Sequence, residues 1–296
     1  MTHSNSSSVV LVAGATGFLG KEICRQLIQK NKAVKGLVRT TSDPGKVAEL
    51  KDLGVQIIEG DLKNKASLEV ALRGVSAIIS TVSSTMSRQE GDSIQSVDDH
   101  GQKNLIDAAV NAGIRQFIFV SFCFMPGEFP LQTAKRKVEK HLAGTHMSYT
   151  ILQPTYFMEV WLSPNLGFDY PNNKATIYGD GKKGVSWIAI KDVASFAVAS
   201  LDNPEARNKI IELGGPGLLS PLDVIHIFEE NSGQKFDLQF VPGEALKAQK
   251  EAAQDPLSES FAALMLGVAN GSEIDMKATI DLFPIQLTSV NEYAKR

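Results

Sequence analysis

The sequence predicts an α/β protein built on a doubly wound parallel sheet, and three observations support this fold class. Short runs rich in β-branched residues alternate with amphipathic segments over residues 9–143. The connections between them are short, as they are where right-handed crossovers join parallel strands. A glycine-rich stretch also follows the first of these runs directly and leads into an amphipathic segment. Together these features predict a sheet with helices on both faces.

The first predicted strand and the turn after it indicate a phosphate site. The strand is V-V-L-V-A at 9–13, and its valines are typical of a fully buried parallel strand. The stretch G-A-T-G-F-L-G follows at 14–20. Gly14 permits the tight turn, Gly17 leaves room for a pyrophosphate, and Gly20 lets the next helix pack closely. The free N–H groups at the start of that helix favour an anion.

A glycine-rich turn can also simply reverse the chain, so its context decides between the two interpretations. Here a strand precedes the turn and a helix follows it. We therefore predict a Rossmann-type dinucleotide-binding turn. The residues expected to contact the cofactor at this turn are Gly14, Thr16, Gly17, Phe18, Leu19 and Gly20.

The next elements follow from apolar periodicity and from residues that begin or end helices. Leu19, Ile23 and Leu27 give residues 18–30 one apolar face, which predicts a helix. Pro44 opens the next short helix and Gly54 ends it. In chain order the first half is predicted to contain strands at 9–13, 33–38, 55–59, 75–80 and 117–121 and helices at 18–30, 44–53, 66–72 and 94–112.

The second half of the chain changes character, because proline, asparagine and aromatic residues interrupt the alternation at 154–173. The elements predicted around this interruption are a helix at 132–143, a strand at 149–152, a strand-helix unit at 185–201, a strand at 209–213 and a helix near 221–231. We expect two domains. They are a Rossmann domain of residues 1–153 plus 185–213, and a smaller substrate-binding lobe of residues 154–184 plus 214–296.

The composition narrows the classes of function. The 296 residues are 43% hydrophobic and carry a net charge of −3 without a long basic run, which argues against nucleic-acid binding. Cys24 and Cys123 lie far apart and form no metal or redox motif. Residues 1–8 are polar and are expected to form a loose tail, and no apolar run reaches the length of a membrane span. A cytoplasmic location is therefore the expectation.

The end of the second strand bears on the choice of dinucleotide. An acidic residue there would accept hydrogen bonds from a free ribose 2′-hydroxyl. The chain has L-V-R-T at 37–40 instead, with Arg39 and then the hydroxyl of Thr40. A guanidinium can hold a 2′-phosphate through paired N–H donors, although Arg39 can also be a solvated residue at a strand end. We predict NADP(H) rather than NAD(H).

Residues after the third and fourth strands are expected to line the rest of the cofactor. Asp61, followed by Leu62, can accept from the exocyclic amine of adenine, cap the next helix, or do both. Thr81, Val82 and Ser83 follow the fourth strand and are expected beside the middle of the dinucleotide. The histidines show no metal-binding spacing, so no metal is predicted.

The chain resembles the NmrA-like and isoflavone-reductase-like group of atypical short-chain dehydrogenases/reductases. The resemblance covers nearly the whole chain in order, and it is specific for the family but much less so for the substrate. The matching segments are G-A-T-G-F-L-G at 14–20, L-V-R-T at 37–40, G-D-L at 60–62, G-Q-K-N-L-I-D-A-A at 101–109, V-S at 120–121, A-K-R-K-V-E at 134–139, Y-T-I-L-Q-P at 149–154, W-I-A-I-K-D-V-A at 187–194 and L-G-G-P at 213–216.

Typical members of the wider superfamily carry Tyr-x-x-x-Lys after the fifth strand, and this chain departs from that motif. Lys135 matches the lysine, but Leu131 stands in the tyrosine's place. By resemblance to isoflavone-reductase-like enzymes, Lys135 is the proton donor or relay while NADPH delivers hydride. Alternatively, Lys135 only contacts the cofactor ribose, or is solvated together with Arg136 and Lys137.

The resemblance implies further site residues. Ser121 sits where the superfamily's substrate-polarising hydroxyl begins, and Tyr156 is the alternative acid unless it is a packed lid residue. Backbone at Pro154, Thr155 and Tyr156 is expected to face the nicotinamide amide. Three phenylalanines near the fifth strand suit either an apolar or aromatic substrate or core packing. They are Phe122, Phe124 and Phe129.

Two functions remain open at this stage. The first is an NADPH-dependent reductase of a small, largely apolar carbonyl, quinone or conjugated compound, with catalytic residues Lys135, Ser121 and Tyr156. The second is a non-catalytic NADP(H)-sensing regulatory or assembly protein of the NmrA type, which the missing tyrosine permits. Nothing in the sequence indicates the oligomeric state.

Overall fold

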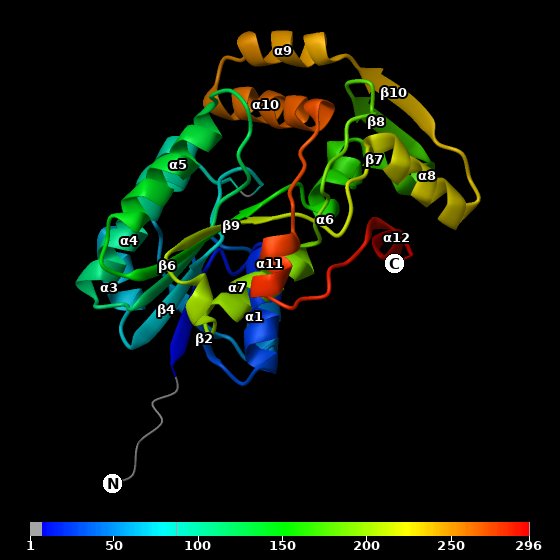
Figure 1. Ribbon diagram of the computed structural model, residues 1–296. Helices are drawn as coiled ribbons and strands as arrows, with labels where there is room; N and C mark the ends of the chain where they lie inside the picture. Colours follow the sequence, from blue (N-terminus) through cyan, green and yellow to red (C-terminus); the bar gives the residue numbers. More distant parts are fainter. Residues whose placement is uncertain (1–7, 87, 296) are drawn as a thin grey trace. The chain divides into compact units, whose positions relative to one another are not determined.

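The computed structural model, which describes residues 8–86 and 88–295, contains a seven-stranded sheet (Figure 1). The expected tail at residues 1–8 lies outside the described residues except for Ser8. The strand order is β3-β2-β1-β4-β5-β6-β9, and the pairings from β3 to β6 are parallel. The strands are β1 (Val9–Ala13), β2 (Ala33–Val38), β3 (Gln56–Glu59), β4 (Val75–Ser80), β5 (Gln116–Val120), β6 (Ser148–Pro154) and β9 (Lys209–Leu213).

The order of the strands reverses at β1, which has β2 on one side and β4 on the other. In open parallel sheets, ligands bind at such a switch point, outside the carboxyl ends of the strands. The fold class predicted from the sequence is therefore confirmed, and its switch point lies at the end of β1, where the glycine-rich stretch begins.

Helices cover both faces of this sheet, as the doubly wound class requires. On one face, Leu68, Leu105 and Leu142 from three helices pack against strand residues that include Ile78 and Phe119. The elements that alternate with the strands are α1 (Phe18–Gln29), α2 (Pro44–Asp52), α3 (Lys65–Ala71), the π-helix η1 (Ile94–Gly101), α4 (Gln102–Asn111), α5 (Pro130–Ala143) and α7 (Ile190–Ser200).

Two differences from the predicted elements stand out. The predicted helix at 94–112 forms, but its first part is the π-helix η1 and only the rest is α-helical. The strand predicted within 185–201 does not form, since Val185 and Ile188 make only isolated bridges. At this point Gly215 passes so close that a Cβ on it would lie 1.7 Å from the carbonyl oxygen of Trp187.

The chain divides into two compact units. Unit 1 contains the described residues up to Ser121 together with Ala134–Leu152 and Ala194–Ile210, and unit 2 contains Phe122–Thr133, Gln153–Val193 and the described residues from Ile211. The domain boundaries expected from the sequence remain a prediction. Most of the seven-stranded sheet belongs to unit 1, and so do the glycine-rich turn and Lys135.

Unit 2 has a small sheet of its own, with strand order β10-β8-β7. The ring of Phe168 lies 4.8 Å from that of Phe228 and 5.6 Å from that of Phe236, so an aromatic cluster packs beside this sheet. The further elements are α6 (Met158–Trp161), η2 (Pro164–Leu166), β7 (Phe168–Asp169), η3 (Tyr170–Asn172), β8 (Lys174–Tyr178), η4 (Pro204–Ala206, in unit 1), α8 (Pro221–Ser232), β10 (Asp237–Val241), α9 (Gly243–Glu251), α10 (Pro256–Asn270), α11 (Lys277–Leu282) and α12 (Val290–Ala294).

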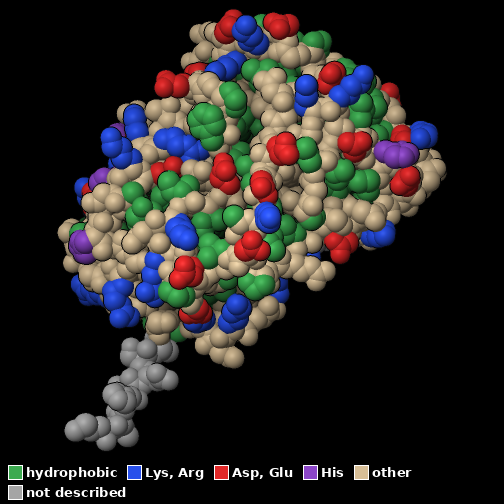
Figure 2. All heavy atoms as spheres, in the orientation of Figure 1, with side chains coloured by type: hydrophobic (Ala, Val, Ile, Leu, Met, Phe, Trp, Pro, Cys, Tyr) green, Lys and Arg blue, Asp and Glu red, His purple; other side chains and the backbone are tan. Residues whose placement is uncertain are grey.

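The surface carries charges of both signs. Over most of the face shown in Figure 2, basic and acidic side chains are interspersed, in keeping with a net charge of −3. Among the helices that the structure describes, none combines the length and the apolar character needed to cross a membrane.

Candidate functional site

The turn after β1 requires glycine at its first position. β1 and β4 run in parallel with Ala13 opposite Ser80, so Gly14 and Thr81 leave the sheet together. Gly14 has a φ of +83°, and a Cβ on it would lie 2.6 Å from Oγ1 of Thr81. The turn closes when the amide of Gly17 donates to the carbonyl oxygen of Gly14 at 3.0 Å. A larger residue at position 14 would be both strained and obstructed.

The N-terminus of α1 is arranged to receive an anion. Gly17 is its N-cap and supplies no side-chain hydrogen bond, and the first turn of the helix contains no acidic residue. The helix begins directly against the turn, because a Cβ on Gly20 would lie 2.0 Å from the carbonyl oxygen of Gly14. The N–H groups and the positive end of the helix dipole therefore meet no side-chain cap within the described chain.

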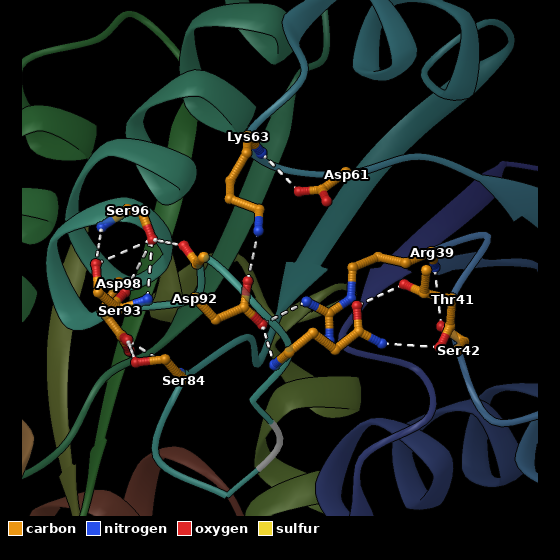
Figure 3. Close-up of polar contacts among 12 residues, drawn as sticks. Arg39, Thr41, Ser42, Asp61, Lys63, Ser84, Asp92, Ser93, Ser96 and Asp98 are labelled. Carbon is orange, nitrogen blue, oxygen red and sulfur yellow. Dashed lines mark hydrogen bonds and ion pairs between the residues drawn. The ribbon is translucent and has the colours of Figure 1, made fainter.

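The register of β2 and β3 brings two predicted residues to the same edge of the sheet. Val38 pairs with Glu59, so Arg39 and Asp61 both lie just beyond the paired strand ends. The Asp61 carboxylate accepts from the backbone N–H of Lys63 at 2.8 Å (Figure 3). The N-cap of α3 is Asn64 rather than Asp61.

Arg39 is paired with an acidic residue that the sequence interpretation did not consider. Its Nη1 lies 2.6 Å from Oδ2 of Asp92, and Nζ of Lys63 lies 2.6 Å from Oδ1 of the same carboxylate (Figure 3). Burial alone would raise the pKa of Asp92. Hydrogen bonds from Lys63, Arg39 and the backbone N–H of Gln89 outweigh burial and hold this pKa below its usual value.

Lys135 is buried in unit 1 rather than solvated. It is 4% exposed, whereas the side chain of Lys137 on the same helix is 58% exposed. Its Nζ donates to the carbonyl oxygen of Val82 at 3.3 Å and lies 5.1 Å from the centre of the Phe119 ring. Burial lowers the pKa of Lys135, and the nearby carboxylate of Asp98 opposes this shift.

Asp98 is the ionic partner of Lys135, and η1 holds it. Its Oδ1 lies 3.5 Å from Nζ of Lys135, and its side chain is fully buried. The other oxygen, Oδ2, accepts from both the backbone N–H of Ser84 at 3.0 Å and its hydroxyl at 2.6 Å. π-Helical turns are often found at functional sites, but the apolar pattern of residues 94–112 also fits an ordinary α-helix. No signal in the sequence therefore identified Asp98.

Ser121 adds a hydroxyl at the end of β5. Its Oγ is buried and has no hydrogen-bond partner among the residues that the structure describes. Ser121 follows Phe119 by two residues, and its N–H continues the ladder by donating to Leu152. Side chains two apart in a strand share a face. Ser121 therefore lies on the face of the sheet where Nζ of Lys135 contacts Phe119.

Tyr156 belongs to unit 2, where its hydroxyl is already engaged. The hydroxyl donates to the carbonyl oxygen of Leu264 at 3.1 Å and lies 3.7 Å from the sulfur of Met125. Burial raises the pKa of Tyr156 well above its ordinary value, with a smaller contribution from Cys123. The ring packs edge-on against Trp161 at 4.9 Å between centroids.

The remaining predicted residues divide by exposure and by unit. In unit 1 the exposed residues are Gly17, Phe18 and Thr40. The half-buried ones are Thr16, Thr81, Val82 and Ser83, and the buried ones are Leu19 and Leu62. Pro154 and Thr155 are buried in unit 2, where the Thr155 hydroxyl donates to the carbonyl oxygen of Ser186. The rings of Phe122 and Phe129 stack at 5.9 Å, and Phe124 is exposed. Within the described residues there is no cluster of metal-binding side chains.

The fold and the glycine turn at its switch point are those of the Rossmann class. Residues 6–294 match the NmrA-like family, and the chain belongs to this family. The resemblance inferred from sequence motifs is thereby confirmed.

Named relatives include a reductase homologue and an assembly factor. The chain is 29% identical to "Isoflavone reductase homolog IRL" of Zea mays, over 99% of this chain and 99% of the relative. It is 32% identical to "Photosystem II assembly factor Ycf39" of Synechocystis sp., over 80% of this chain and 72% of the relative. A crystal structure of the NADPH-dependent quinone oxidoreductase QOR2 of Escherichia coli, complexed with NADPH, has the same fold. Its TM-score is 0.77 at 23% identity, over 96% of this chain and 98% of that one.

Proposed function

We propose that the protein is an NADPH-dependent reductase of a small, largely apolar carbonyl, quinone or conjugated substrate. The observation that carries the proposal is the buried ammonium of Lys135, paired with Asp98 and bonded to Val82 next to the glycine turn. A lysine buried in this way is costly unless its charge is used or compensated. The names of the maize reductase homologue and the Escherichia coli quinone oxidoreductase support the same activity.

The described residues fit NADP(H). The uncapped start of α1 suits the pyrophosphate, and the guanidinium of Arg39 suits the 2′-phosphate. Oδ1 of Asp61 accepts from Lys63, and Oδ2 is proposed to accept from the adenine amine. Val82 and Ser83 follow β4 at the switch point, where the middle of a dinucleotide lies in this class. When bound, the reduced nicotinamide supplies a hydride.

Lys135 is proposed to hold the proton that the reduced substrate takes up. Burial makes the ammonium a better proton donor because it lowers the pKa, while the carboxylate of Asp98 favours the charged form that holds the proton. The unpartnered hydroxyl of Ser121 is proposed to donate a hydrogen bond to the substrate oxygen. Tyr156 is the weaker candidate for the acid, because its hydroxyl already donates to Leu264.

Turnover of NADPH with a panel of quinones, aldehydes and enones tests this function. Substituting Lys135→Ala should lower kcat/KM by about 10²–10⁴-fold, the usual contribution of a positioned acid. Lys140→Ala, at an exposed position of the same helix, is the matched control and should leave kcat/KM unchanged. Unaltered turnover in Lys135→Ala would exclude this residue as the proton donor.

The second candidate is a non-catalytic, NADP(H)-sensing regulatory or assembly protein. Leu131 at the position of the superfamily tyrosine and the Synechocystis assembly factor among the relatives favour it. This function predicts that NADPH binds tightly while none of the substrates in the panel is reduced. Measurable reduction of one of them, lost in Lys135→Ala, would decide for the enzyme.

A further inference from the structure

We propose that Asp92 positions Arg39 and Lys63 as a paired cation site, so that Lys63 binds the cofactor's 2′-phosphate together with Arg39. The inference rests on the proposed function, in which the protein binds NADP(H), and it explains how the chain selects NADP(H) over NAD(H). Asp92 acts in it as a positioning residue that does not itself contact the phosphate.

Three separate connections of unit 1 meet at this carboxylate. Arg39 follows β2, Lys63 follows β3, and Asp92 lies between β4 and η1 (Figure 3). Each cation lies 2.6 Å from a different oxygen of Asp92. The backbone N–H of Gln89 donates to Oδ2 at 3.0 Å, which fixes the carboxylate relative to its own loop. One acidic side chain therefore ties together the ends of two adjacent strands.

The exposure of the three side chains indicates whether Asp92 positions the two cations or competes with a bound phosphate for them. The side chain of Asp92 is 1% exposed, whereas those of Arg39 and Lys63 are 24% and 30% exposed. The carboxylate is thus covered, and each cation keeps a side that solvent reaches. A guanidinium has five N–H donors and an ammonium has three, so one bond each to Asp92 leaves donors for another anion.

The charges of the three groups favour a dianion. Two cations and one carboxylate leave a net charge of +1, and a 2′-phosphate is attracted to the cations through charge-assisted hydrogen bonds. Without Asp92, Arg39 and Lys63 would repel each other and their long side chains would have to be ordered at the moment of binding. With Asp92 in place, this ordering is complete before the nucleotide arrives.

A second contact holds the Arg39 loop against the Asp92 loop. Nε2 of Gln89 donates to the carbonyl oxygen of Thr41 at 2.8 Å, and the hydroxyl of Thr41 donates to Oε1 of Gln89 at 2.5 Å. The hydroxyl of Ser42 also accepts from the backbone N–H of Arg39 at 2.9 Å. These bonds fix the backbone from which the guanidinium extends, so the site depends on more than one ion pair.

Binding of 2′,5′-ADP and 5′-AMP tests the inference without any need for turnover. These fragments differ only by the 2′-phosphate, and calorimetry gives a Kd for each. In Lys63→Gln and in Asp92→Asn, 2′,5′-ADP should bind about 10-fold more weakly, the worth of one charged hydrogen bond, while 5′-AMP binding stays within about twofold. Lys63→Arg should retain most of the preference because it keeps the charge.

A surface ion pair supplies the control. Lys32 lies 2.8 Å from Asp202 and immediately precedes β2, at the opposite end of that strand from Arg39. Lys32→Ala should therefore leave the Kd of both fragments unchanged. If Asp92→Asn does not fold, the comparison of Lys63→Gln with Lys63→Arg still tests the paired site.

The outcomes separate the inference from the function on which it rests. Wild-type protein that binds 2′,5′-ADP no better than 5′-AMP would contradict the NADP(H) proposal itself. A wild-type preference that survives in both Lys63→Gln and Asp92→Asn would overturn only the paired site. Tighter binding of 2′,5′-ADP to Asp92→Asn would also overturn it, since Asp92 would then be a competitor for the cations.

Discussion

At the scale of single residues, two carboxylates favour the charged form of Lys135, Asp98 most strongly and Glu139 less so. Burial favours the neutral amine, and Asp98 at 3.5 Å favours the ammonium. Coulomb attraction at this distance is strong where water is excluded. The balance among burial, these carboxylates and the opposing charge of Arg136 sets the pH range over which Lys135, as the proposed donor, carries its proton.

Substituting Asp98→Asn should therefore shift the alkaline limb of the pH–rate profile. The donor must be protonated, so activity falls as pH rises through the pKa of Lys135. Asp98 raises this pKa, and its removal lowers it, so the fall should begin at a lower pH in the variant. The measurement is kcat/KM against pH with the best substrate found.

Asp99→Asn is the matched control for this profile. Asp99 is the next residue in η1, but it pairs with Lys103 at 2.5 Å instead of Lys135. Its substitution should leave the alkaline limb in place. If the limb does not move in Asp98→Asn either, then Lys135 is not the group that titrates in the reaction.

At the scale of elements, the junction of β1 and α1 depends on space as well as on backbone conformation. Gly14 and Gly54 both have positive φ, at +83° and +88°, but a Cβ at Gly54 would meet no atom of the described residues within 4 Å. At Gly14 the same atom would meet Thr81 at 2.6 Å. Comparing an added side chain at these two positions therefore separates the effect of backbone strain from the effect of the clash with Thr81.

Gly54→Ala should destabilise the protein by about 1–2 kcal/mol, the cost of left-handed backbone for an L-residue. Gly14→Ala should cost more and should also weaken NADPH binding, because the turn that is proposed to contact the nucleotide must move. Urea unfolding measures the first effect and NADPH titration the second. Equal losses of stability with unchanged NADPH binding would show that the turn adapts to a side chain.

The sequence predicted the elements better than it predicted their contacts. β1, β2, β4 and β9 have the predicted bounds, because glycine or polar residues on both sides of their apolar residues mark where each strand begins and ends. Asp92 could not be identified, since it lies in a polar loop and meets Arg39 only through the order of the strands. The sequence pattern did not predict the burial of Asp98, because a π-helical segment changes which side chains of a helix face inward.

At the scale of the whole molecule, the sheet connects nucleotide binding to stability. Apart from Lys135 on α5, the expected cofactor contacts of unit 1 come from four connections that follow β1, β2, β3 and β4. A ligand that binds only the folded chain stabilises it by mass action, by about 2.7 kcal/mol at a concentration 100 times its Kd. Because Arg39 is expected to contact the 2′-phosphate, NADPH should raise the Tm more than NADH at equal concentration.

Arg39→Ala should remove most of this difference between the two nucleotides. Its loss of affinity should fall on NADPH, since NADH has no 2′-phosphate for the guanidinium to contact. Thermal unfolding with each nucleotide measures the effect, with Lys32→Ala again as the control. If Arg39→Ala reduces the increase in Tm equally for NADPH and NADH, then Arg39 does not contact the 2′-phosphate.

The two successive carboxylates of η1 also fix how α5 is rotated about its own axis. Asp98 pairs with Lys135, and Asp99 lies 3.9 Å from Lys137, which is two residues further along α5. Residues two apart point about 200° apart around a helix. Neighbouring acids in one short π-helical segment thus hold α5 at two points on its circumference. Rotation of α5 about its axis in either direction would lengthen one of these ion pairs. The orientation of Lys135 therefore depends on η1 as well as on the packing of α5 itself.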